Sequence, residues 1–277
     1  MNMDALIGSI AEKSAVRMEP GDYVKDGLIY CGHCNTPKQC RISIGGSPRI
    51  VGCQCACRER EYAAEIKARK DREKRLEIEE LRSTGIADRK IREYTFDHAE
   101  DCPEIRFARE YCGGWERMYG SNQGLLFWGG VGSGKTFAAG CIANELISRG
   151  IPVMVTSFPR ILGIDYAKRW ETIDAMMRYP LLVIDDLGAE RRNEFALETV
   201  YSVVDERYKA RKPLIVTTNL RLQDMQSPQD TAMARIYDRV LEMCAPLLFK
   251  GRSRRPAAAK DKMAELKRIL KGEENEQ

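Results

Sequence analysis

The sequence predicts an α/β domain with a parallel sheet covered by helices, preceded by a small cysteine-rich module and a charged helical linker. Three observations support this fold class. Short apolar runs alternate with longer helical stretches through the second half of the chain. Six of the ten cysteines lie between Cys31 and Cys57, and interleaved positive and negative side chains fill residues 58–82. We therefore divide the chain into residues 1–57, 58–85, 86–255 and a helical tail at 256–277.

Composition places the chain among ordinary globular proteins. It has 277 residues, 43% of them apolar, and a net charge of +4, which permits nucleic-acid binding without requiring it. Neither a signal-peptide pattern nor an apolar run of about 18 residues is present. We expect a cytoplasmic protein with no membrane partner, in which clustered cysteines hold metal rather than form disulfides.

The cysteine-rich module has the pattern of a zinc ribbon. A hairpin at residues 41–44 and 49–51, with a glycine turn between, can bring two cysteine groups together around tetrahedral Zn²⁺. Cys31 and Cys34 form the first ligand pair. The second pair comes from Cys53, Cys55 and Cys57; we favour Cys53 with Cys55, with Cys57 close behind, over Cys40 and His33. Reduced structural thiols are the alternative.

The linker predicts a solvated helix. Residues 58–82 carry nine basic and eight acidic side chains and no proline or glycine. At about 1.5 Å per residue this helix spans roughly 37 Å. The sequence Ser83-Thr84-Gly85 ends it.

The remaining elements alternate in order along the chain. Apolar runs predict strands at residues 124–128, 151–156, 180–185 and 213–218. Helical patterns cover residues 137–147, 158–178, 194–209 and the region from 231 onward. Such alternation is typical of a parallel sheet covered on both faces.

The loop between the first of these strands and its helix reads GGVGSGKT and fits G-x-x-x-x-G-K-[ST]. Glycines let backbone N–H groups wrap a polyphosphate at a helix N-terminus, where the dipole favours negative charge. The pattern predicts an ATP site with Mg²⁺ bound by Thr136. Its nucleotide-binding residues are Gly129, Gly130, Val131, Gly132, Ser133, Gly134, Lys135 and Thr136.

Polar residues follow two further strands at the same predicted sheet edge. Asp185 and Asp186 end the apolar run Leu181–Ile184. We expect Asp185 to organise Mg²⁺ beside the nucleotide and Asp186 to orient the attacking water. Asn219 follows the next strand and is placed to sense the terminal phosphate or hold the water. A strand-end cap and a turn-forming asparagine are the structural alternatives.

Arg235 and Arg239 are four residues apart and so share one helical face. One of them can reach the γ-phosphate of a neighbouring subunit as an arginine finger. Salt bridges to Asp238 or Glu242 are the alternative.

These motifs together resemble the AAA+ ATPases of the DnaC, DnaI and IstB group, which are helicase loaders and transposition proteins. GGVGSGKT is similar to the Walker A motif, LLVIDDLGAE to Walker B, TTNL to sensor 1 and RIYDR to the arginine-finger segment with Arg239 as the finger. The segment FKGRSRR is similar to the terminal G-x-S-x-R element, which implies that Arg255 contacts nucleotide as a sensor 2-like residue.

The resemblance implies ATP hydrolysis, self-association into a ring or spiral, single-stranded DNA binding, and a cysteine module that engages the replicative DNA helicase. We expect DNA contacts at Phe158, Arg160, Lys168 and Arg169, unless Phe158 packs into the core. Asp186 stands where the family has Glu, so we expect slow hydrolysis without partners. An IstB-like transposition helper and a non-hydrolysing ATP-gated adaptor are the rival functions.

Overall fold

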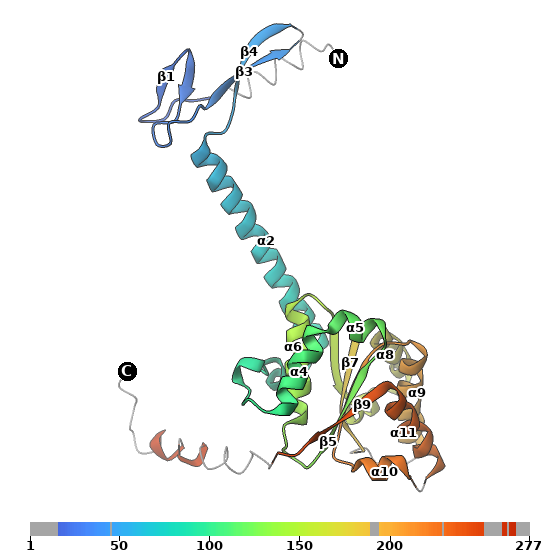
Figure 1. The fold of residues 1–277 in the computed structure, drawn as a ribbon. Helices are drawn as coiled ribbons and strands as arrows, with labels where there is room; N and C mark the ends of the chain where they lie inside the picture. The colour runs from blue at the N-terminus through green and yellow to red at the C-terminus, as the bar shows by residue number, and fades with distance from the viewer. Residues whose placement is uncertain are drawn as a thin grey trace. The chain divides into compact units, whose positions relative to one another are not determined.

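The computed structural model of the chain describes residues 16–44, 46–188, 194–228, 230–251, 262–264 and 266–269. The chain divides into two compact units, Met1–Leu76 and Glu77–Gln277, whose elements are labelled in Figure 1. Within the described ranges, no helix combines the length and hydrophobicity that a membrane span requires.

The first unit contains two antiparallel hairpins. Strand β3 (Gln39–Ile44) pairs with β4 (Ser47–Gly52), which confirms the predicted hairpin. Strand β1 (Tyr23–Lys25) pairs with β2 (Leu28–Tyr30), a hairpin that the sequence analysis missed. Its turn has positive φ at both Asp26 and Gly27, 51° and 73°. Asp-Gly is the usual sequence of such a turn, so the signal was present.

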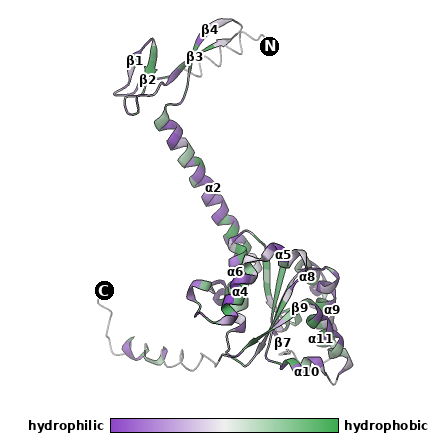
Figure 2. Cartoon of the chain, in the orientation of Figure 1, coloured by the Kyte–Doolittle hydropathy of each residue, from purple (hydrophilic) through white to green (hydrophobic). Residues whose placement is uncertain are grey.

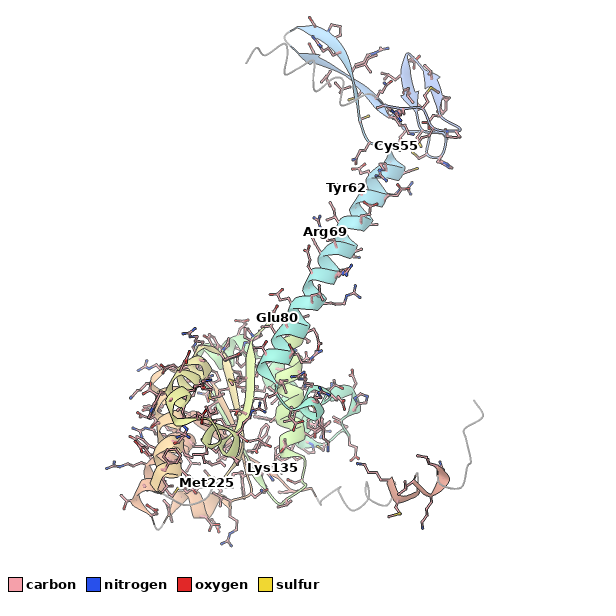
Figure 3. All side chains as sticks on the ribbon, turned by 180° about the vertical axis from the view of Figure 1, so that it is seen from behind. Cys55, Tyr62, Arg69, Glu80, Lys135 and Met225 are labelled. Atoms are coloured by element: carbon pink, nitrogen blue, oxygen red, sulfur yellow. The ribbon has the colours of Figure 1, made fainter. Side chains whose placement is uncertain are left out.

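Helix α2 (Ala56–Gly85) is the predicted charged helix. It is mostly hydrophilic in Figure 2, and its labelled side chains Tyr62, Arg69 and Glu80 in Figure 3 are exposed. The helix ends at Gly85, where a Cβ would lie 2.0 Å from the carbonyl oxygen of Val153. Glycine is therefore required for the end of α2 to approach the second unit's sheet so closely.

A five-stranded parallel sheet organises the second unit, in the order β6-β7-β8-β5-β9. Four of its strands are those predicted: β5 (Gly124–Gly129), β6 (Val153–Ser157), β7 (Leu181–Leu187) and β8 (Leu214–Thr218). The fifth, β9 (Cys244–Phe249), corrects the prediction of continuous helix after residue 231. Pro246 explains its place, because proline interrupts a helix and is tolerated on an edge strand.

Helices cover both faces of the sheet. One side has α3 (Arg89–Arg92), η1 (Phe96–His98), α4 (Pro103–Gly113), α5 (Trp115–Gly120) and α6 (Lys135–Ser148). The other has α7 (Phe158–Leu162), α8 (Tyr166–Arg178), α9 (Glu194–Lys209), α10 (Leu222–Gln226) and α11 (Thr231–Met243). The predicted helix 158–178 is thus two helices, interrupted at residues 163–165. The described tail residues 262–264 and 266–269 are helical.

Successive side chains of a strand point to opposite faces of the sheet, so the core has two parts, one on each face. On β7, Leu181 and Val183 are buried under the α4–α6 side, whereas Leu182 and Ile184 are buried under the α9–α11 side. This is the period of two that a strand covered on both faces requires. The central strands are accordingly hydrophobic in Figure 2. This rigid sheet fixes the edge at which the carboxyl ends of β5, β7 and β8 meet.

Candidate nucleotide site and metal centre

The phosphate loop joins β5 to α6. Gly134 caps the helix with φ 103°, a conformation that favours glycine, and α6 begins at Lys135. At the other end of the loop, Gly129 has φ 138°, and a Cβ there would lie 2.4 Å from the carbonyl oxygen of Phe249 on β9. The strand missed from the sequence therefore holds the start of the loop in place.

A cavity of about 440 Å³ lies at this loop and is lined by residues 131–137, Asp185, Asp186 and Asn219. Its walls suit a polyphosphate. The N-terminus of α6 opens into it, and Lys135 is buried. The Ser133 hydroxyl is buried, and no described residue hydrogen-bonds it, so a phosphate oxygen can satisfy it.

Lys135 holds the loop together. Its Nζ donates hydrogen bonds to the carbonyl oxygens of Gly129 at 2.9 Å and Gly130 at 2.8 Å. It also donates to Asn219 Oδ1 at 2.8 Å. The parallel sheet thus brings Asn219 to the loop, as the topology predicted. The role of Asn219 toward a phosphate or water remains a prediction.

Asp185 and Thr136 make an oxygen-rich pair that fits Mg²⁺. The Thr136 hydroxyl donates to Asp185 Oδ1 at 2.9 Å, so the loop and β7 meet directly. Burial raises the pKa of Asp185, while hydrogen bonds from Thr217 and Thr136 lower it and the neighbouring Asp186 raises it. A divalent cation offsets such a buried negative charge, and hard oxygen donors are what Mg²⁺ prefers.

The same cavity has a wall that no sequence motif marks, formed by Lys90, Tyr94 and His98. Tyr94 packs against Phe137 of α6 with ring centroids 5.0 Å apart. These residues come from α3 and the segment after it, far before the loop in sequence. No spacing rule connects them to it, so only the folded chain reveals them.

The two arginines of α11 have different surroundings. Arg239 pairs with Asp205 of α9 at 2.8 Å and lies over the Tyr201 ring at 4.7 Å. Its partner is therefore neither Asp238 nor Glu242, the alternatives considered from the sequence. Arg235 is exposed, and within the described chain it forms no ion pair. Whether either acts on a neighbouring subunit remains a prediction.

Two of the four expected DNA contacts are wrong. Phe158 is fully buried in the α7–α9 side of the core. Arg169 is also buried and donates to the carbonyl oxygens of Leu162 and Ile164. The start of α7 is amphipathic, so the aromatic ring packs inward. Arg160 and Lys168 are exposed and remain candidates.

A further exposed aromatic side chain of α8 was missed. Trp170 of α8 is 45% exposed and offers a stacking ring near Lys168 in sequence. Arg255, the expected sensor 2-like residue, lies outside the described residues.

Four cysteines of the first unit form a metal-sized cluster. The Sγ atoms of Cys31, Cys34, Cys55 and Cys57 all lie within 4.8 Å of one another. A hydrogen bond with Thr36 lowers the pKa of Cys34 to about 5, which favours a thiolate. The set has the ligand number and type of a structural zinc site.

The preference for Cys53 with Cys55 was wrong. The Cys53 backbone N–H donates to the carbonyl of Lys38, which continues the hairpin, and its sulfur faces the carbonyl oxygen of Pro37 at 3.4 Å. Helix α2 begins at Ala56, whose N–H donates to the Thr36 hydroxyl. Cys55 and Cys57 lie on either side of Ala56. The first residues of α2, rather than the end of β4, therefore approach Cys31 and Cys34.

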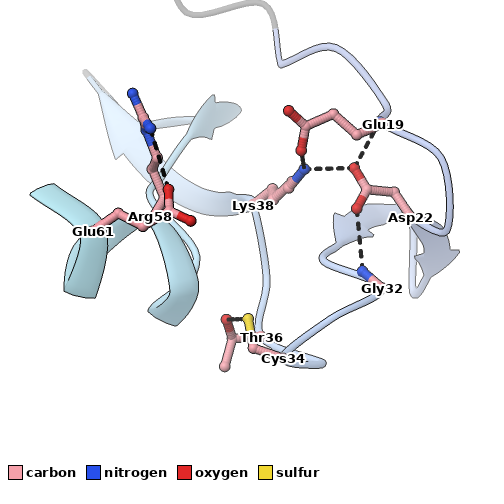
Figure 4. Close-up of polar contacts among 8 residues, drawn as sticks. All are labelled: Glu19, Asp22, Gly32, Cys34, Thr36, Lys38, Arg58 and Glu61. Atoms are coloured by element: carbon pink, nitrogen blue, oxygen red, sulfur yellow. Dashed lines mark hydrogen bonds and ion pairs between the residues drawn. The ribbon is translucent and has the colours of Figure 1, made fainter.

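An ion-pair network supports the cysteine cluster (Figure 4). Lys38 Nζ lies 2.6 Å from both Glu19 and Asp22. The Lys38 hydrogen bond, with backbone donors including Gly32, lowers the pKa of Asp22 to about 2. Gly32 directly follows Cys31, so these charges hold the first cysteine pair against the segment before β1.

A family model described as IstB-like ATP binding protein matches residues 60–262. The replicative helicase loader DnaI of Bacillus subtilis is 22% identical over 81% of this chain and 78% of its own length. The replicative helicase loader DnaC of Escherichia coli K12 is 26% identical over 43% of this chain and 50% of its own. A crystal structure of DnaI matches with a TM-score of 0.53 and 25% identity, covering 62% of this chain and 98% of that one.

Proposed function

The chain belongs to the IstB-like ATP-binding proteins, within the DnaC, DnaI and IstB group of AAA+ ATPases, and from this premise we propose that it is an ATP-dependent loader of a replicative helicase. The extent of the DnaI match carries the proposal. The match to DnaI covers 81% of this chain. The second unit, Glu77–Gln277, has 201 of the 277 residues, about 73% of the chain, and is too short to contain the whole match. Likeness to a helicase loader therefore extends into the cysteine-bearing unit.

Within the loop cavity, we assign each side chain a task. Lys135 neutralises the outer phosphates, and the loop amides fix their position. Thr136 and Asp185 would hold Mg²⁺, which stabilises charge on the phosphate oxygens when bound. Asp186 orients the attacking water, and Asn219 responds to the terminal phosphate.

Partners complete the proposal. The zinc-bound first unit contacts the helicase, and the ATPase unit assembles with further copies along single-stranded DNA. Arg160, Lys168 and Trp170 supply phosphate-pairing charge and a stacking ring. Arg235, exposed on α11, is better placed than the ion-paired Arg239 to act on a neighbouring subunit.

Co-purification with the host's hexameric helicase tests the proposal. The full chain should retain the helicase with ATP and Mg²⁺ and hydrolyse ATP slowly. Lys135→Ala should lose ATP binding, whereas Lys67→Ala, which removes an exposed lysine of α2 outside the cavity lining, is a control that keeps the loop intact. A wild-type chain that binds MgATP but never the helicase would exclude a loader.

The name of the matching family favours one rival, an IstB-like transposition helper. That function predicts ATP-dependent binding of double-stranded target DNA and no helicase capture. A non-hydrolysing adaptor is distinguished by turnover: it would bind ATP with Mg²⁺ yet release no phosphate even with helicase and DNA present.

A further inference from the structure

The two aspartates of β7 lie in a strand irregularity. Ile184 pairs with Val216 of β8, and Leu187 pairs with Thr218, so two residues of β7 stand opposite the single residue Thr217. This two-against-one arrangement is a β-bulge. Asp186 at its centre has φ 57°, a left-handed conformation that Asp and Asn adopt more readily than other side chains.

The bulge explains how both carboxylates reach one cavity. Successive side chains of a regular strand point to opposite faces, yet Asp185 and Asp186 both line the cavity beside the loop. An extra residue re-aims a side chain at the cost of local ladder bonds. The N–H of Asp186 must therefore find another acceptor.

Thr217 supplies that acceptor and more. The Asp186 backbone N–H donates to Thr217 Oγ1 at 3.0 Å, and the same hydroxyl donates to Asp185 Oδ1 at 2.5 Å. Thr217 is fully buried. A hydroxyl has one proton to donate, and here a carboxylate accepts it. Because Asp185 also accepts from Thr136, one oxygen connects β8 to both aspartates and, through Asp185, to the phosphate loop.

We propose that Thr217 is a positioning residue for ATP hydrolysis: its hydroxyl holds the bulge so that Asp185 is aimed at the magnesium position and Asp186 at the attacking water. This rests on the proposed ATPase function. Outer-shell partners of metal ligands typically change metal affinity or activity by about 10- to 100-fold when removed. Thr217 acts through the two aspartates and touches no substrate itself.

The neighbouring residue offers a matched control. Thr218 is equally buried, but its hydroxyl donates to the Leu187 carbonyl at 2.7 Å and accepts from the Leu220 N–H at 3.1 Å. Thr218→Val therefore removes a buried hydroxyl from the same strand without touching either aspartate. Thr217→Val removes the proposed hydroxyl and keeps the shape.

The test measures binding of a non-hydrolysable ATP analogue to the full chain, in Mg²⁺ and in EDTA, together with kcat and KM for ATP. Thr217→Val should raise the Mg²⁺ concentration for half-maximal binding by about 10- to 100-fold and lower kcat, with affinity in EDTA unchanged. Thr217→Ser should restore both. Should the valine variant not fold, Thr217→Ala against Thr217→Ser isolates the hydroxyl with the methyl absent in both.

Two results would overturn the positioning role while the ATPase function stands. One is the same Mg²⁺ concentration for half-maximal binding in Thr217→Val and Thr218→Val. The other is a loss of analogue affinity in EDTA as large as the loss in Mg²⁺. A wild-type chain that binds no nucleotide with or without Mg²⁺ would remove the proposed function, and this inference with it.

Discussion

Replacing single cysteines tests the metal centre directly. Cys55→Ser removes a thiolate from the cluster, whereas Cys53→Ser, two residues earlier, removes a sulfur that faces the Pro37 carbonyl instead. We expect Cys55→Ser to lose zinc and to unfold the first unit. Cys53→Ser should keep both the metal and the fold. The two variants make the same chemical change at positions two residues apart in the chain.

The size of the effect follows from the cluster. Structural zinc contributes about 10–16 kcal/mol in zinc-finger peptides near neutral pH. Shared over the four thiolates, each ligand contributes about 2.5–4 kcal/mol, so loss of one should weaken zinc binding roughly 10²- to 10³-fold. The described part of the first unit before α2 buries little besides Cys31, Lys38 and Cys55. We therefore expect that such a small core does not hold the hairpins together without a metal.

Zinc content of the purified full chain, titrated against a competing chelator, gives the affinity, and limited proteolysis reports folding of the first unit. ATP binding by the second unit serves as the internal control and should be unchanged in both variants. Stoichiometric zinc in Cys55→Ser together with loss in Cys53→Ser would refute the assignment. So would a wild-type chain free of zinc that resists proteolysis throughout residues 16–55.

Three further outcomes are expected. At pH values above about 4, Asp185→Asn should raise the melting temperature of the nucleotide-free chain. Burial raises the pKa of this carboxyl, so its ionised form destabilises the folded state. The difference from wild type should vanish in acid, which a pH series of melting curves measures. Arg239→Ala should destabilise the monomer by about 1–2 kcal/mol through loss of its contacts with Asp205 and the Tyr201 ring, whereas Arg235→Ala should leave thermal stability unchanged and lower turnover only at concentrations where copies associate. Phe158→Ala should cost about 3–5 kcal/mol in denaturant unfolding, far more than any effect of a surface DNA contact on stability.

Much of the second unit could be predicted because its signals are local. The phosphate loop, the apolar strand before Asp185 and the alternation of strands with helices each lie within a few residues of one another. Strand β9 was missed because its run Cys244–Phe249 directly continues a helical pattern, although Pro246 within it was a signal against helix; the pairing with β5 identifies the strand. The turn at Asp26-Gly27 carried a usable signal.

Other features depend on contacts that the sequence does not reveal. Spacing alone could not choose among Cys53, Cys55 and Cys57, because the choice depends on where the hairpin ends and α2 begins. The contact of Arg169 with the Phe195 ring and the pairing of Arg239 with Asp205 likewise depend on neighbours distant along the chain. The bulge opposite Thr217 also depends on how two distant strands pair, because in a regular strand the two aspartate side chains would point to opposite faces.

The hydrogen bonds of Lys135 give nucleotide binding a route to the edge of the sheet. An ammonium donates three hydrogen bonds, and Lys135 already donates to two loop carbonyls and to Asn219. A phosphate oxygen that binds Lys135 must replace one of these acceptors. Exchange of Asn219 would free its amide oxygen beside the Lys135 ammonium, and Asn219 directly follows β8, two residues after Thr217. The strand that positions the aspartates would then also be the one that responds to the nucleotide.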